Sequence, residues 1–194
     1  MAKPDRSILP GLTLRARGEA ELIIDSEHFQ RVVREGLLKA RISLDIATAN
    51  FKSMLVPSST GRRARSILEV LRSLARKGVE IRLLHGGVPS SPMLRELRRE
   101  LPGGICIRRC PRLHAKVVVV DCREMYVGSA NLTGAGLGAK ADGKRNFEVG
   151  IWTSSAALID PVLERFNAIW EGRLCAPCRR RAVCPVPLEE PRLE

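Results

Sequence analysis

The sequence is poor in aromatic side chains and has no long apolar run. Phe, Trp and Tyr together make up 4% of its 194 residues, so platforms on which nucleic-acid bases stack are scarce. No apolar segment approaches the roughly 20 residues needed to cross a bilayer. The first residues, MAKPDRSILPGL, lack the apolar stretch of a secretory signal. We therefore expect no integral membrane association, no export and a cytoplasmic location.

Acidic side chains are also in deficit. The chain has 33 Lys and Arg against 21 Asp and Glu, a formal net charge of +12. This surplus favours an anionic partner, with nucleic acid the first candidate and an anionic membrane surface the second. A basic globular domain without such a partner carries the same signature. The length fits one domain with a single sizeable core.

The apolar pattern alternates between strands and helices, and later strands follow one another directly. It predicts an α/β fold: a mixed β-sheet of about seven strands flanked by helices on both faces. An irregular arm (1–20) precedes the domain (21–171), and a tail rich in Cys, Arg and Pro (172–194) follows it. The expected strands are 21–24, 42–47, 79–84, 105–109, 113–121, 124–129 and 147–152. The expected helices follow Ser26 and span 63–77, 91–100 and 160–170, the last starting late because of Pro161.

The segment 114–131 concentrates the polar chemistry. His114 and Lys116 lie two positions apart and share one face of a strand. Ser129 and Asn131 repeat that spacing at the end of the next strand. If the strands pair, a nucleophile, a cation, a hydroxyl and an amide meet over one patch, which suits a phosphate. Asp121 has the opposite parity, which predicts a structural role in the turn.

These residues carry a family resemblance. The pattern H-x-K-x4-D-x6-G-S-x-N resembles the signature of the phospholipase D superfamily, and the resemblance extends over roughly residues 20–171. A downstream Glu in that family supports the catalytic His, and Glu148 in RNFEVGI resembles it. The motif positions are His114, Lys116, Asp121, Gly128, Ser129 and Asn131.

The resemblance implies a two-step reaction without a catalytic metal. His114 would attack phosphorus and form a phosphohistidine, while a second His114 protonates the leaving oxygen and later activates water. Lys116 and Asn131 would hold non-bridging oxygens, and Ser129 would add a hydrogen bond at the phosphate or orient its neighbours. Glu148 would fix the His114 tautomer. Asp121 and Gly128 would be structural.

The chain has a single copy of the motif. Neither His28 nor His85 is followed by Lys two positions later, so the second histidine is expected from another subunit. This predicts a homodimer with the site on its two-fold axis, as in the short nuclease-type branch of the family.

The expected function is a metal-independent phosphodiesterase, an endonuclease that hydrolyses DNA or RNA through a phosphohistidine. A phospholipid hydrolase or phosphatidyltransferase is one alternative, and a nucleic-acid-binding module without turnover is another. Arg108, Arg109 and Arg112 precede His114 and are candidate phosphate contacts; exposed arginines that only solvate the surface have the same pattern.

The tail contains Cys175, Cys178 and Cys184 in the spacing C-x2-C-x5-C. The first two are spaced as in metal knuckles, which predicts a structural zinc site or an iron–sulfur cluster. Three thiolates are one short of a closed tetrahedral zinc site, so Cys106, Cys110, Cys122 or a histidine would supply the fourth ligand. Free or oxidised cysteines on a basic tail are the alternative.

Overall fold

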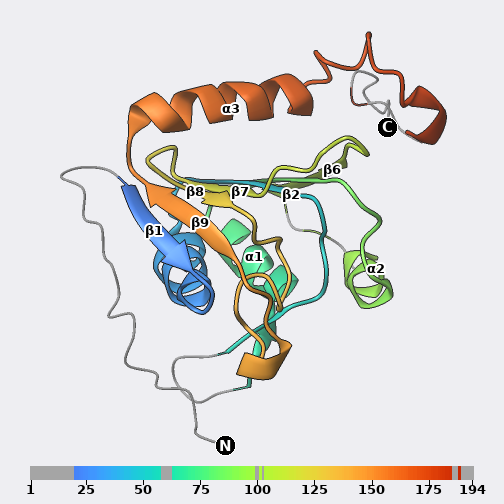
Figure 1. Cartoon of the computed structure of the whole chain (residues 1–194). Coiled ribbons are helices and arrows are strands. Elements are labelled where there is room, and N and C mark those ends of the chain that lie inside the picture. Colours follow the sequence, from blue (N-terminus) through green and yellow to red (C-terminus); the bar gives the residue numbers. More distant parts are fainter. Residues whose placement is uncertain (1–19, 58–62, 99–100, 102, 185–187, 189–194) are drawn as a thin grey trace, which may run out of the picture.

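The computed structural model describes residues 20–57, 63–98, 101, 103–184 and 188. Its centre is a seven-stranded sheet in the order β1-β9-β8-β7-β2-β5-β6 (Figure 1). β2 pairs parallel with β5, and β5 with β6, whereas the other neighbours in this sheet are antiparallel. The mixed seven-stranded sheet is thus confirmed. The strands are β1 (Ala20–Ile24), β2 (Ser43–Thr48), β5 (Glu80–His85), β6 (Ile105–Arg109), β7 (Val117–Val120), β8 (Glu124–Gly128) and β9 (Val149–Thr153).

Helices cover both faces of the sheet, as predicted (Figure 1). One face packs against η1 (Phe29–Gly36), η2 (Leu37–Lys39), α1 (Ile67–Ala75) and α2 (Ser91–Leu97). The larger apolar core lies there and includes Val32, Leu71 and Trp152. The other face packs against α3 (Ala156–Trp170) through a smaller core that includes Leu84 and Phe166. The short elements are β3 (Leu55–Val56), β4 (Arg65–Ser66), η3 (Asp142–Lys144) and η4 (Arg181–Val183).

Helix α1 shows how local sequence sets the helix boundaries. Ser66 accepts a 3.1 Å hydrogen bond from the Glu69 N–H, and the Glu69 carboxylate accepts one from the Ser66 N–H. This capping box satisfies two backbone donors that the first turn leaves without partners. Gly78, in the left-handed region at φ +92°, ends the segment as expected. The buried face includes Ile67 and Leu71.

Helix α3 starts earlier than predicted, at Ala156 rather than Asp160. The N–H groups of Leu158 and Ile159 already donate to the Ser155 carbonyl, so the first turn forms ahead of Pro161. The proline removes one backbone donor, but its would-be acceptor belongs to Ala157, an exposed residue. Leu158 lies in this first turn, and its side chain is 51% exposed.

The predicted arm lies outside the described residues, apart from Ala20, which begins β1. Within the described residues, no helix combines the length and apolar character needed to cross a membrane.

Candidate active site

The candidate site lies at the end of the β7–β8 hairpin. The expected strand 113–121 included His114 and Lys116. β7 begins only at Val117, so both residues precede the strand. The pairing nevertheless extends beyond β7, because the Gly128 N–H donates to the Lys116 carbonyl at 3.2 Å. This bond brings Lys116 beside the start of the Ser129–Asn131 segment.

His114 and Lys116 are in direct contact. The Lys116 ammonium lies 3.2 Å from His114 Nδ1 and donates to the His114 carbonyl at 2.7 Å. The ammonium also lies 3.4 Å from His114 Nε2, and since it has donors only, it can bond whichever ring nitrogen is unprotonated. Partial burial lowers the pKa of the Lys116 amine, although the Glu148 carboxylate opposes that shift. His114 is exposed, so a substrate can reach its ring.

Ser129 and Glu148 form the second part of the site. The Ser129 hydroxyl donates to Glu148 Oε2 in a short hydrogen bond and accepts from the Val149 N–H at 3.0 Å. Asn146 Nδ2 donates to Glu148 Oε1 at 3.0 Å. In the described chain Glu148 therefore bonds Ser129 and Asn146, and it does not form the His114 hydrogen bond that the resemblance implies.

The main chain of Glu148 is held by Asp25, a residue that sequence reasoning missed. The Glu148 N–H donates to Asp25 Oδ1 at 2.8 Å, and the Asp25 N–H donates to the Glu148 carbonyl at 2.9 Å. Asp25 adopts a left-handed φ of +46° to make both bonds. Its position just after β1 gave no sequence signal for this contact, which spans more than a hundred residues.

The Asn131 side chain is oriented by its own carbonyl oxygen. Oδ1 accepts from the Asn50 N–H at 2.9 Å and lies 3.3 Å from the Thr48 hydroxyl. A backbone N–H can bond only the oxygen of the amide, so this contact distinguishes oxygen from nitrogen. The Nδ2 group is left to donate elsewhere, which is the arrangement that a phosphate oxygen needs.

Two facing glycines make room for the ring of Tyr126 beneath the site. Gly128 pairs with Gly150 across β8 and β9. A Cβ on Gly128 would lie 2.5 Å from Tyr126 Oη, and one on Gly150 would lie 2.3 Å from the Tyr126 ring. The hydroxyl accepts from the Ala130 N–H at 3.0 Å, which fixes the backbone between Ser129 and Asn131.

Tyr126 and His28 support the site from the interior. His28 Nε2 lies 3.1 Å from Tyr126 Oη, and its Nδ1 lies 2.9 Å from the Asp25 carbonyl oxygen. Burial raises the pKa of Tyr126 to about 12 and lowers that of His28. The His28 side chain is fully buried.

Asp121 lies in the turn at the other end of the hairpin. Its carboxylate accepts from the N–H groups of Arg41, Ile42 and Ser43 at 2.8–3.1 Å. Burial would raise the pKa of the Asp121 carboxyl, but the three backbone donors outweigh it and hold the pKa below its ordinary value. Asp121 and Cys122 both have φ near +55°. The carboxylate thus joins the turn to the segment that leads into β2.

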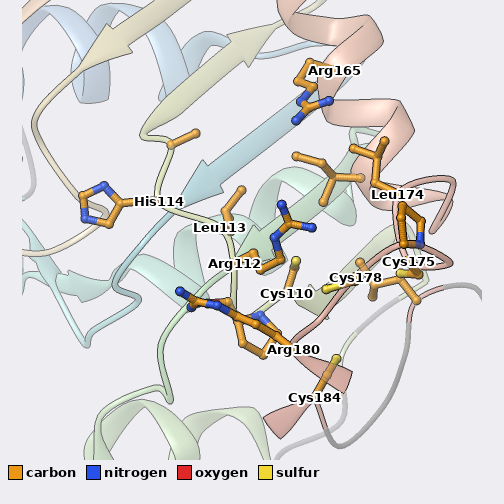
Figure 2. A pocket seen from close by; sticks show the side chains of 15 residues that line it. Cys110, Arg112, Leu113, His114, Arg165, Leu174, Cys175, Cys178, Arg180 and Cys184 are labelled. Atoms are coloured by element: carbon orange, nitrogen blue, oxygen red, sulfur yellow. The ribbon is translucent and has the colours of Figure 1, made fainter. Parts of the chain in front are cut away.

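The three candidate arginines differ in position. Arg108 donates to the Trp170 carbonyl at 2.6 Å and stacks over the Trp170 ring. Arg109 donates to the Gly86 carbonyl at 3.1 Å. Both guanidinium groups are therefore engaged with the fold, at α3 and at the end of β5. Arg112 is exposed and lines a cavity together with His114 (Figure 2).

This cavity, of about 400 Å³, lies between the segment 110–115, the end of α3 and the tail. Cys175, Cys178 and Cys184 line it, and so does Cys110. A hydrogen bond from the Arg180 backbone, with a second from Arg112, lowers the pKa of the Cys178 thiol. Among the described residues, no three His, Cys, Asp or Glu side chains are placed closely enough to hold a metal ion.

Comparison with known proteins identifies a matching family. Residues 33–170 match the family model described as "Cardiolipin synthase, PLD-like domain". Cardiolipin synthase B of Escherichia coli K12 is 35% identical in an alignment of 133 residues, which covers 61% of this chain and 30% of the relative. The chain therefore spans less than a third of the length of that relative.

Three solved structures have a similar fold at low sequence identity. NucT from Helicobacter pylori has a TM-score of 0.57 at 16% identity, covering 78% of this chain and 95% of the other. Nuc from Salmonella typhimurium, described as a phospholipase D family member, has a TM-score of 0.56 at 17% identity, covering 79% and 95%. TrmBL2, an archaeal chromatin protein described for its DNA binding, reaches 0.51 at 14% identity, covering 79% and 52%.

Proposed function

The chain belongs to the phospholipase D-like family of phosphodiesterases, and on that premise we propose that it is a metal-independent nuclease acting on DNA or RNA. The observation that carries the proposal is the contact of His114 with Lys116 at the open end of one hairpin, where the Gly128 N–H bonds the Lys116 carbonyl immediately before Ser129. The net charge of +12 favours a polyanionic substrate over a small ester. The scarcity of aromatic residues favours contacts with the phosphate backbone and weak sequence preference.

The reaction proceeds in two displacements. A His114 ring nitrogen attacks phosphorus, the bond from phosphorus to the leaving oxygen breaks, and that oxygen takes a proton from a second His114. Water then attacks phosphorus and loses a proton to the second ring, which breaks the P–N bond and restores the first imidazole. Lys116 and the Nδ2 group of Asn131 donate to the non-bridging oxygens, where negative charge grows in the transition state.

The second His114 comes from a second copy of the chain, because the described site contains one such histidine. An exposed apolar face adjoins the half-site and gives the second copy a surface to cover. Val127 lies on the same face of β8 as Met125, which packs under α3. On the neighbouring strands, Ile151 pairs with Val127 and Leu22 pairs with Ile151. The apolar side chains of this face are 37–54% exposed. They are Leu22, Ile24, Val127, Val149 and Ile151.

The sequence pattern of β1 and β9 is typical of strands that are covered on both faces. Along β1 and β9, residues that point to the opposite side, such as Ile23 and Trp152, are buried in the larger core. A strand that is apolar on both faces is typical of a sheet covered on both sides. Val127 and Val149 adjoin Ser129 and Glu148 in the chain, so a partner docked here would bring its own His114 half-site near this one.

Phosphatidyl transfer is the second candidate function, favoured by the 35% identity with cardiolipin synthase B. The apolar face would then lie against lipid instead of a second chain. The two functions differ in substrate but share the phosphohistidine chemistry.

One experiment separates the candidates. Labelled single- and double-stranded DNA and RNA, and in parallel phosphatidylglycerol vesicles, are incubated in excess EDTA with wild type or with His114→Ala. Cleavage of nucleic acid by wild type alone is expected. Product from vesicles only would replace the nuclease with the lipid reaction. Nucleic-acid binding without turnover of either substrate would leave only the binding module.

A further inference from the structure

Four of the six cysteines line one cavity, although one of them is far from the other three in the sequence. Cys175, Cys178 and Cys184 come from the tail, whereas Cys110 follows β6. Figure 2 shows their side chains around the same space, with the Cys178 sulfur directed toward Cys110. Cys106 and Cys122 do not line this cavity. Both are exposed, Cys106 on β6 and Cys122 in the β7–β8 turn.

We propose that Cys110, Cys175, Cys178 and Cys184 bind one structural zinc ion and thereby fasten the C-terminal tail to the segment that carries His114. Four thiolates complete the tetrahedral coordination that the three tail cysteines leave one ligand short. Of the three cysteines considered for that fourth position, Cys110 is the one that lines the cavity. The proposal is independent of which phosphodiester the enzyme cleaves.

Backbone geometry places the thiols for this role. Gly172, at φ +75°, reverses the chain after α3, so the tail returns toward β6. The Cys178 N–H donates to the Cys175 carbonyl at 2.8 Å, which closes the two-residue spacer into a turn. Cys110 is also fixed, since its N–H donates to the His85 carbonyl and its carbonyl accepts from the Leu113 N–H, both at 2.9 Å.

The positive charge around the cavity favours a zinc site with four thiolate ligands, which has a net negative charge. Arg112, Arg165 and Arg180 line it, and none of the described lining residues is Asp or Glu. Zinc with four thiolates carries a net charge of about −2, which these guanidinium groups offset. The His114 ring points away from the cysteines (Figure 2), which gives the ion a structural rather than a catalytic position.

The described part of the tail is mostly exposed. Of residues 171–184, only Gly172 is buried, so this segment has no apolar core of its own. Short segments without a core are commonly stabilised by a metal or by disulfides. The sulfur atoms line the cavity without forming a coordination shell. Zinc binding therefore requires the tail turn to move inward until each Zn–S distance is about 2.3 Å.

The test measures metal content of the full chain, purified reduced and without chelators. We expect about one zinc per chain in wild type, its loss in Cys110→Ser, and its retention in the matched controls Cys106→Ser and Cys122→Ser. Cobalt substituted for zinc is expected to show thiolate-to-metal charge-transfer absorption together with tetrahedral d–d bands.

A second readout needs no variant. Alkylation of the native wild-type protein, mapped by mass spectrometry, is expected to modify Cys106 and Cys122 and to spare the four cavity cysteines until a chelator is added. Iron with inorganic sulfide, or a disulfide among these cysteines in metal-free protein, would overturn the proposal. Alkylation of Cys110 at the rate of Cys106 while the tail cysteines stay protected would refute Cys110 as the fourth ligand.

Discussion

The Ser129 hydroxyl donates its hydrogen to the Glu148 carboxylate and accepts one from the Val149 N–H. The hydroxyl is thus committed as a donor within the chain, and its remaining capacity is to accept. Ser129 therefore acts on the site by joining β8 to β9, and Glu148 provides the negative charge near Lys116.

Removal of the negative charge of Glu148 is expected to reduce turnover while the fold persists. Glu148→Gln keeps an oxygen for Asn146 or Ser129 but no longer balances the Lys116 ammonium, so we expect kcat to fall about 10²-fold, on the scale of losing one preorganised electrostatic group. Steady-state kinetics on a labelled oligonucleotide measures the change. Glu164→Gln, on the exposed side of α3, is the control. Wild-type kcat in Glu148→Gln would contradict this role.

The Asn131 amide provides a test in which the shape hardly changes. Asn131→Asp retains an oxygen for the Asn50 N–H but replaces the Nδ2 donor with a second acceptor, which repels a phosphate oxygen. We expect kcat/KM to fall about 10²–10³-fold, with an unchanged circular dichroism spectrum. Asn167→Asp is the matched control, because Asn167 lies on α3 and its Oδ1 likewise accepts a hydrogen bond, from Arg82. Equal losses in both variants would show a general charge effect.

Gly128 is expected to be required for packing rather than for chemistry. In Gly128→Ala the new methyl would lie 2.6 Å from Gly150 Cα, a backbone atom, and 2.5 Å from Tyr126 Oη. We expect the free energy of unfolding to fall by about 1–3 kcal/mol, as for other overpacked sites. Urea denaturation measures it. Gly143→Ala, which has open space at its Cβ position, should remain within error of wild type.

Asp121 should make stability depend on pH in the acid range. Its folded-state pKa lies below the ordinary value of 3.8, so its stabilising contribution is complete above the unfolded-state pKa and is lost as pH falls through the folded-state pKa. The stability gap between wild type and Asp121→Asn should therefore shrink on acidification from about pH 5. Urea titrations across this range measure the gap. A constant gap, or a similar trend for the exposed control Asp160→Asn, would contradict the assignment.

The strands and the motif were predictable because their signals are local. Alternation of apolar residues located β2 and β5 closely, and the spacing of His114, Lys116, Ser129 and Asn131 was visible in the sequence. The contacts that orient these groups are not local. Asp25 meets Glu148, and His28 meets Tyr126, only after β1 has paired with β9 and the first helix has packed beneath the sheet. Pro161 was misleading because its missing hydrogen bond falls on the exposed side of α3.

The shared site gives the sharpest test of the dimer. If each active centre needs two His114 side chains, a chain with His114→Ala inactivates every wild-type chain that it joins. Equal amounts of the two chains, unfolded and refolded together, should then retain about one quarter of the activity of the same total of wild type, because random pairing gives that fraction of wild-type dimers. Independent monomers would retain about half, since only wild-type chains would act.

The apolar face predicts where that pairing is lost. Ile151→Asp places a charge at the centre of the face, so it should give a monomer by sedimentation and lose nuclease activity, with its secondary structure intact. Val88→Asp changes an equally apolar side chain that is 68% exposed in the loop after β5, and it should remain dimeric and active. An active Ile151→Asp monomer would show that the reaction does not need a second chain. A dimeric Ile151→Asp would move the interface to another surface.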